Sequence, residues 1–181
     1  MEAISTPIEG LYIIKPRVFT DDRGAFFESF NLKTFQKITG TNVSFVQDNI
    51  STSNKNVVRG LHFQAPPFAQ GKLVSVVKGK ALDVAVDIRK KSPTYGQHYS
   101  IELSSENKLM FWIPEGFAHG FSALEDDTIF SYKCTNYYHK ESEVSILYND
   151  PKLNINWGVS QEILSEKDKL AQPFSTFVSP F

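Results

Sequence analysis

The chain has 181 residues, of which 41% are hydrophobic and 22% charged, which is typical of one globular domain over residues 1–181. Nineteen basic residues nearly balance twenty acidic ones, so the net charge of −1 argues against binding to nucleic acid or to an anionic membrane. The single cysteine, Cys134, excludes an internal disulfide and a metal site made of thiolates alone. Because no apolar run approaches the roughly 20 residues of a membrane span and no signal-peptide pattern is present, we expect a cytoplasmic protein.

The first half of the chain is predicted to contain a helix followed by strands. Asn31 can cap a helix over Leu32–Thr39, whose apolar residues recur at helical spacing, and Gly40 can end it. From Val43 to Asn49, every second residue falls on one face, which predicts a strand.

Two further strands and a short helix are predicted in the second half. Alternation predicts strands over Leu82–Ile88 and Thr128–Cys134. Residues 160–170 are a candidate helix of one or two turns with Ile163 and Leu164 buried. The last ten residues, 172–181, hold three Phe and two Pro, and they form either a tail on the surface or a contact with a partner chain.

Turn signals recur between these segments, at residues 22–24, 78–80, 92–96, 114–116 and 149–151. Many short strands separated by frequent turns favour an antiparallel barrel or a double-sheet roll. We therefore predict a mainly β protein with a few short helices.

His62 is the histidine with the clearest functional context. It follows Arg59 and Gly60 in a predicted strand, where a glycine can mark a β-bulge. Without a bulge, Arg59 and His62 would point to opposite faces, whereas a bulge turns both toward one cavity. His98 and His139 lie in polar turns and are expected at the surface.

His119 belongs to the run Pro-Glu-Gly-Phe-Ala-His at 114–119, which resembles the second motif of the cupins, a double-sheet roll family. Many cupins bind a metal through a His-x-His pair and a Glu in their first motif. Here that motif offers only His62, followed by Phe63 and Gln64, and two ligands are too few for a metal site. We therefore expect no metal.

Eight ordered segments resemble the dTDP-4-dehydrorhamnose 3,5-epimerase family of nucleotide-sugar cupins. They include Arg-Gly-Leu-His-Phe-Gln at 59–64 and Trp-Ile-Pro-Glu-Gly-Phe-Ala-His at 112–119. The resemblance runs from about residue 8 to residue 170, and Ser131 and Cys134 depart from the family pattern away from any proposed catalytic group. The segments are 22–30, 45–49, 59–64, 70–74, 83–89, 112–121, 132–138 and 149–151.

The resemblance implies a cupin-type double-stranded β-helix, or jelly-roll barrel, that inverts C3 and C5 of a 4-keto-6-deoxy sugar attached to dTDP. Both carbons flank the C4 ketone, so the chemistry needs a base, an acid and a stabiliser of the enolate oxygen, and no cofactor. It implies His62 as the base, Asp168 as the carboxylate that orients it, and Tyr132 as the acid.

Three more residues are implied in the same cavity. Lys72 is expected to stabilise the enolate oxygen, and His119 and Asp83 are expected to form a supporting pair. Without the resemblance, spacing alone would indicate that Lys72 and Asp83 are ordinary charged residues of a strand or of the surface. It would likewise indicate that Asp168 is a solvated carboxylate near a helix end.

Recognition of the dTDP-sugar follows from the resemblance as well. Planar guanidinium groups match diphosphate oxygens, and a base needs a flat apolar partner, which Tyr138 is expected to supply with Phe26 beside it. The implied substrate-binding residues are Arg23, Phe26, Glu28, Gln47, Asp48, Asn49, Arg59, Lys72, His119, Tyr138, Glu143 and Lys167.

The resemblance also implies a homodimer in which the N-terminal strand around residues 23–30 reaches into the neighbour's site. Two alternatives stay open at this point. One is an epimerase of a single carbon, or a ketoisomerase, acting on the same kind of sugar. The other is a sugar-binding roll without catalysis.

Overall fold

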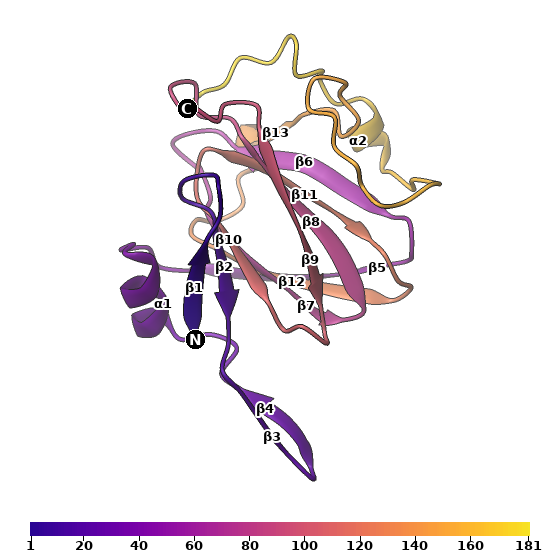
Figure 1. The fold of residues 1–181 in the computed structure, drawn as a ribbon. Helices are drawn as coiled ribbons and strands as arrows, with labels where there is room; N and C mark the ends of the chain where they lie inside the picture. Colours follow the sequence, from indigo (N-terminus) through magenta and orange to yellow (C-terminus); the bar gives the residue numbers. More distant parts are fainter.

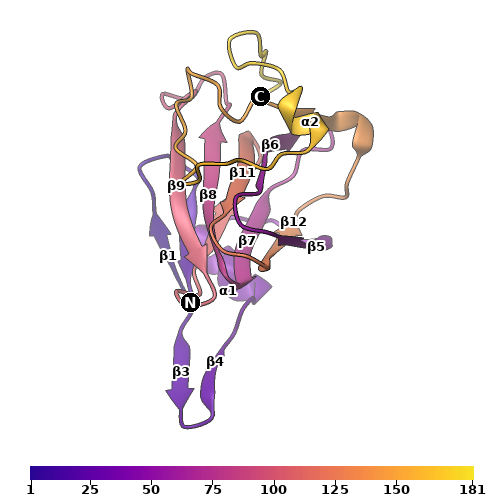
Figure 2. The same ribbon diagram turned by 90° about the vertical axis from the view of Figure 1, so that its right-hand side faces the viewer.

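The computed structural model of the protein describes residues 1–181 and contains two antiparallel sheets that face each other (Figures 1 and 2). In spatial order, the six-stranded sheet consists of β1 (Glu2–Ser5), β2 (Tyr12–Lys15), β10 (Met110–Ile113), β7 (Lys72–Lys78), β12 (Thr128–Cys134) and β5 (Gln47–Ser53). The five-stranded sheet consists of β13 (Glu143–Ser145), β6 (Val58–Gln64), β11 (Phe117–Ala123), β8 (Lys80–Asp87) and β9 (His98–Ser104). The predicted mainly β jelly roll with few short helices is therefore confirmed.

The remaining elements lie outside these two sheets. A hairpin of β3 (Val18–Asp21) and β4 (Gly24–Phe27) projects away from the body (Figures 1 and 2). The helices are α1 (Leu32–Thr39), the 3-10 turn η1 (Lys140–Ser142) and α2 (Glu166–Lys169). None of the helices is long and apolar enough to cross a membrane.

Apolar side chains fill three layers. The central layer lies between the sheets and contains residues of β7, β8, β9, β10, β11 and β12, among them Phe111, Phe117 and Phe130. A second layer, with Phe63 and Trp157, covers the outer face of the five-stranded sheet. The third joins α1 to the outer face of the six-stranded sheet. Because both faces of each sheet carry apolar side chains, strict two-residue alternation is weak in the central strands.

The predicted helix over Leu32–Thr39 is confirmed at both ends. The side chain of Asn31 accepts a hydrogen bond from the backbone N–H of Thr34 (3.1 Å), as an N-cap residue does. Gly40 follows in the left-handed conformation with φ of 69°, which favours glycine at a helix end.

Two other predicted elements need correction. The strand predicted to start at Val43 starts at Gln47, because Val43 and Phe45 instead pack against α1 in the third apolar layer. The second helix is a single turn, Glu166–Lys169, and Ile163 before it is 53% exposed rather than buried. Ile163 forms an isolated bridge with Val57, so extended backbone replaces helix there.

The predicted bulge at Gly60 is confirmed by the pairing of β6 with β11. His119 faces His62, whereas Phe121 faces Arg59, so the register shifts by one residue between the two pairs. Gly60 has φ of +136°, and a Cβ at this position would meet the Cα of Gly120 at 2.6 Å. Only glycine fits such a close approach of two backbones.

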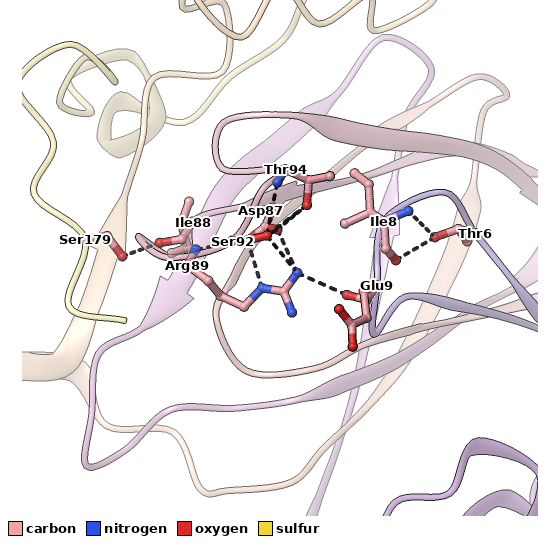
Figure 3. Close-up of polar contacts among 9 residues, drawn as sticks. All are labelled: Thr6, Ile8, Glu9, Asp87, Ile88, Arg89, Ser92, Thr94 and Ser179. Carbon is pink, nitrogen blue, oxygen red and sulfur yellow. Dashed lines mark hydrogen bonds and ion pairs between the residues drawn. The ribbon is translucent and has the colours of Figure 1, made fainter.

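A buried carboxylate, Asp87, ties the end of β8 to the N-terminal segment (Figure 3). It accepts two hydrogen bonds from the guanidinium of Arg89, at 2.9 and 2.7 Å, and one from each hydroxyl of Ser92 and Thr94. Arg89 in turn donates to the carbonyl of Glu9 (3.0 Å). Burial alone would raise the pKa of Asp87, but these donors lower it to about 2.

The C-terminal segment packs on the second apolar layer of this chain. Phe177 is 8% exposed, and the Ser179 hydroxyl donates a hydrogen bond to the carbonyl of Ile88 (Figure 3). Asp150 accepts from the backbone N–H of Phe174 (2.7 Å). Residues 172–181 therefore pack along the body of this chain.

We expect Asp87→Asn to lower the free energy of unfolding at pH 7 by at least about 2 kcal/mol, because a buried partner of Arg89 loses its charge. The folded pKa of Asp87 lies below its unfolded value, so its stabilisation is complete above about pH 4 and declines as the pH falls toward 2. Urea unfolding of both proteins at pH 7 and pH 3 should therefore show a smaller difference at pH 3.

A matched control for this test is Asp127→Asn. Asp127 forms an exposed pair with Lys78 at 3.6 Å, and its positive φ of 52° suits asparagine. Exposed pairs contribute little, so its unfolding free energy should change by less than about 1 kcal/mol. Equal losses in the two variants would contradict the assignment of Asp87 as the stronger contact.

Candidate active site

Two adjoining cavities lie at one end of the space between the sheets, with volumes of about 440 and 240 Å³. Both are lined by His62, Lys72 and Tyr132. Strand alternation explains why polar side chains gather there, since successive strands turn polar residues inward at this end of the roll. The inward residues are Gln47 and Asn49 of β5, His62 of β6, Lys72 of β7, Asp83 of β8, His119 of β11 and Tyr132 of β12.

His62 pairs with the carboxylate of Asp168, as the resemblance implied. The distance from His62 Nε2 to Asp168 Oδ1 is 2.5 Å, and Asp168 is only 3% exposed. Ser165 caps α2 through its side chain and places Asp168 on the inner side of that turn. Burial raises the pKa of Asp168, but hydrogen bonds from His62 and Ser165 and the nearby Lys167 ammonium hold it below its ordinary value. The carboxylate is therefore ionised and can orient the imidazole.

Tyr132 faces the same cavities from the opposite sheet. Its strand, β12, belongs to the six-stranded sheet, whereas β6 with His62 belongs to the five-stranded one. Burial raises the pKa of Tyr132, and the nearby Cys134 and Glu143 add to this effect while Arg59 opposes it. The phenol therefore keeps its proton at neutral pH and can act as an acid.

Lys72 and His119 line the larger cavity together with His62 and Tyr132, and the fully buried Asp83 pairs with His119 behind them. His119 Nε2 lies 2.8 Å from Asp83 Oδ2, and the second carboxylate oxygen, Oδ1, is buried without a partner. Burial raises the pKa of Asp83, opposed by His119 and Lys72. Burial likewise lowers the pKa of Lys72, and the surrounding anionic groups oppose it. The implied supporting pair is thus in place beside a desolvated cation.

The smaller cavity is polar and holds several of the residues implied in substrate binding. Tyr138 donates its backbone N–H to Gln47 Oε1 (2.9 Å) and its hydroxyl to Glu143 Oε2 (2.9 Å). The other Glu143 oxygen lies 2.6 Å from Lys167 Nζ. Burial raises the pKa of Glu143, but Lys167 and Tyr138 lower it below its ordinary value, so the group is ionised. Asn49 lines this cavity as well.

Arg59 lines the larger cavity, because the bulge turns it to the inner face. Its Nε donates to the Ser53 hydroxyl (3.2 Å) and its Nη2 to the Thr52 carbonyl (3.3 Å). These contacts hold the guanidinium at the edge of the site, where it is free to meet an anion.

Four of the implied binding residues lie away from both cavities. Arg23 and Phe26 sit on the projecting β3–β4 hairpin, with Phe26 72% exposed and Arg23 paired with Asp21. Glu28 follows that hairpin and is exposed. Asp48 points to the opposite face of β5 from Gln47 and Asn49 and pairs with Lys133 at 3.0 Å. A single chain therefore does not gather these four residues at the two cavities.

Sequence reasoning missed several residues of the cavities. Phe121 and Phe130 stack face to face, with centroids 4.0 Å apart, and form an apolar wall; alternation along β11 and β12 could have placed them. Ile163 and Leu164 close the larger cavity from an irregular segment that has no periodic signal. Gln64 lies two residues after His62 on β6, so strand alternation alone could have found it.

The histidines outside the site are half-buried rather than free at the surface. The ring of His139 stacks on Phe68 with a centroid distance of 3.8 Å, and burial lowers the pKa of His98. Across the whole chain, no three His, Cys, Asp or Glu side chains gather as a metal ion would need.

The fold and the site together define a jelly-roll protein with a histidine–carboxylate pair and a tyrosine on facing walls of one cavity. Comparisons with known proteins carry this further. The family model of dTDP-4-dehydrorhamnose 3,5-epimerase matches residues 5–176. A curated dTDP-4-dehydrorhamnose 3,5-epimerase from Shigella flexneri is 53% identical over 174 residues, covering 96% of each chain.

Two solved structures agree with this match. The dTDP-4-dehydrorhamnose 3,5-epimerase from Elizabethkingia anophelis superposes with a TM-score of 0.93 at 52% identity and covers 97% of each chain. A dTDP-6-deoxy-D-glucose-3,5-epimerase from Legionella pneumophila, solved with dTDP-4-keto-L-rhamnose, gives 0.94 at 50% identity and covers 98% of this chain and 94% of that one. The chain belongs to the dTDP-4-dehydrorhamnose 3,5-epimerase family, whose members are isomerases.

We expect Asp83→Asn to leave the free energy of unfolding unchanged or to raise it, by up to about 1–4 kcal/mol. The folded pKa of Asp83 lies above its unfolded value, so at neutral pH its charge opposes folding. A neutral amide keeps an acceptor for His119 and removes that charge. Thermal and urea unfolding at pH 7 measure the effect, and a loss above about 1 kcal/mol would contradict it.

Proposed function

We propose that the protein is a dTDP-4-dehydrorhamnose 3,5-epimerase that converts dTDP-4-dehydro-6-deoxy-D-glucose into dTDP-4-dehydro-L-rhamnose, a step of dTDP-L-rhamnose biosynthesis. The observation that supports it best is the placement of His62, with its carboxylate partner Asp168, and Tyr132 on facing walls of one cavity. Inversion of a carbon needs proton removal on one face and proton return on the other, which is the arrangement that two opposite sheets provide.

The proposed reaction inverts the two carbons one at a time, by the same steps. His62 Nδ1, the ring nitrogen that does not contact Asp168, takes the C3 proton. The C–H electron pair forms a C3=C4 double bond, and the C4=O pair moves onto the C4 oxygen to make an enolate. The Lys72 ammonium stabilises that oxygen. Tyr132 then donates its proton to C3 from the other face, the enolate pair forms the new C–H bond, and solvent restores both groups. The same cycle at C5 completes the conversion.

The electrostatics of the site suit this sequence of steps. Ionised Asp168 stabilises the imidazolium that forms when His62 takes a proton. The raised pKa of Tyr132 keeps the phenol protonated until the enolate forms. The buried His119–Asp83 pair lies beside Lys72, and its carboxylate favours the cationic form of that lysine against the effect of burial. No redox cofactor or metal enters the proposed reaction.

The smaller cavity is where we place the nucleotide. Tyr138 offers its ring to the thymine, and Gln47, Asn49 and Glu143 offer directed hydrogen bonds around it. Arg59 and Lys167 are the cations that we assign to the diphosphate, because their charges attract phosphate oxygens. Arg59 lines the larger cavity, and Lys167 pairs with Glu143 of the smaller one.

The remaining binding residues imply a homodimer. Arg23, Phe26 and Glu28 lie on or beside the projecting hairpin, where Phe19 is 51% and Phe26 72% exposed. A second copy that receives this hairpin would bring the three residues to its site and cover the apolar surface. Cys134, the single cysteine, is free, which supports a reducing compartment, and we place the enzyme in the cytoplasm.

Incubation with dTDP-4-dehydro-6-deoxy-D-glucose in heavy water should place deuterium at both C3 and C5, detected by NMR. His62→Asn should lower exchange at both carbons by about 10²–10⁴-fold, because the base is lost. Tyr132→Phe should lower inversion by a similar factor while His62 still exchanges protons. Absence of exchange in the wild type would overturn the proposed function, and exchange at a single carbon would indicate a monoepimerase or ketoisomerase.

A complementation experiment tests the shared site. Arg23→Ala and His62→Asn should each be nearly inactive alone, measured below saturating substrate. In a mixed dimer, the Arg23→Ala chain keeps its His62 and receives an intact hairpin from its partner. Random pairing of equal amounts should therefore recover about a quarter of the wild-type activity. Activity that equals the sum of the two separate variants would exclude a hairpin that crosses between copies.

A further inference from the structure

Gln64 is a buried side chain that the reaction described above does not use. It lies on β6 two residues after His62, so both side chains face the inside of the roll, and it is 4% exposed. It also borders the smaller cavity. A buried amide needs partners for its hydrogens and its oxygen, so the identity of those partners shows what the residue holds in place.

Three hydrogen bonds satisfy the amide. Its Nε2 donates to the carbonyls of Phe68 (2.6 Å) and Tyr137 (3.1 Å), and its Oε1 accepts from the backbone N–H of His139 (2.7 Å). Tyr137 and His139 flank Tyr138 in the chain. Gln64 therefore holds the backbone on both sides of Tyr138, the residue that we assign to the thymine of the nucleotide.

Tyr138 has little packing of its own to fix it. The residue is 54% exposed, and its polar contacts are the backbone N–H to Gln47 Oε1 and the hydroxyl to Glu143 Oε2. The backbone of Tyr138 fixes the direction of its Cα–Cβ bond, and the Glu143 contact holds the far end of the ring. By holding this backbone, Gln64 sets the position from which the ring projects.

The third hydrogen bond connects a second loop to the same amide. Phe68 belongs to the segment between β6 and β7, and its ring stacks on His139 with an interplanar angle of 6°. Gln70 Nε2 donates to the carbonyl of Asn136 (2.7 Å), which adds a further link between the two loops. Of the two glutamines, Gln64 is the one that hydrogen-bonds to the backbone on both sides of Tyr138.

We propose that Gln64 is a positioning residue for nucleotide recognition: by holding the backbone of residues 137–139, it presents the Tyr138 ring to the base of the bound dTDP-sugar. This inference rests on the proposed function, which places the base at Tyr138. Gln64 acts through another residue and leaves the proton transfers between His62, Tyr132 and the sugar unchanged. It therefore determines nucleotide affinity and KM, and not kcat.

The test uses Gln64→Met, which keeps the length of the side chain and removes all three hydrogen bonds. We expect the Kd for dTDP, measured by titration calorimetry on the full chain, to rise about tenfold, as does KM, while kcat stays within about threefold. Gln64→Glu keeps the acceptor for His139 and loses both donors, so it gives a second measurement should the first variant fold poorly. It should also raise Kd, by a smaller factor.

The matched control is Gln36→Met in α1. Gln36 Nε2 donates to the carbonyl of Val43 (2.8 Å), so the same change removes a contact of the same kind far from the cavities. Its Kd and KM should equal those of the wild type.

A thermodynamic cycle with Tyr138→Ala separates positioning from a general structural role. If Gln64 acts through the Tyr138 ring, Gln64→Met should add less than about twofold to the Kd of the Tyr138→Ala protein. Multiplicative losses, or an unchanged Kd in Gln64→Met, would overturn this inference while the proposed function stands. A wild-type protein that does not bind dTDP would overturn the proposed function, and with it the assignment of Gln64.

Discussion

The hydrogen bond between His62 and Asp168 is the contact on which the site depends. It joins β6, a strand in the middle of the fold, to a single helical turn near the end of the chain. A histidine without this partner would be free to rotate and to change tautomer. Much of the C-terminal segment serves to keep Asp168 in reach: Ile163 pairs with Val57 before the turn, Ser165 caps it, and Gln172 pairs with Ile146 after it.

The site also shows that its chemistry and its stability have different demands. Asp83 buries a carboxylate whose Oδ1 has no partner, and Lys72 is desolvated beside it. Neither arrangement favours folding, since buried charge is costly when it is incompletely paired. Enzymes often carry such groups where a developing charge must be stabilised, and three apolar layers around the roll offset the cost here.

The sequence predicted those parts of the fold that local rules determine. The cap at Asn31, the end at Gly40, the strands over residues 82–88 and 128–134 and the bulge at Gly60 follow from propensity, spacing and backbone sterics. Alternation also places the side chains that we propose for catalysis on inner faces. Local rules could not predict the extended backbone at Ile163 or the start of β5, because long-range pairing and packing against α1 decide them.

The candidate site divides in the same way. His62, Lys72, His119 and Tyr132 lie at alternating strand positions, whereas the family resemblance was needed to single out Asp168 on its isolated turn. The hairpin residues Arg23, Phe26 and Glu28 are remote from the cavities of their own chain, so no property of one chain's sequence shows where they act. Quaternary structure must decide their role.

The contact between Gly60 and Gly120 has a consequence for how this enzyme can change. A methyl group at Gly60 would stand 2.6 Å from the Cα of Gly120, and one at Gly120 would stand 2.8 Å from the carbonyl oxygen of Arg59. Neither position carries a functional group, yet each fixes the offset at which an arginine and a histidine share one wall. A side chain at either position would force the two strands apart and displace Arg59 and His62 together, so one substitution would disturb the proposed phosphate-binding residue and the proposed base in a single step.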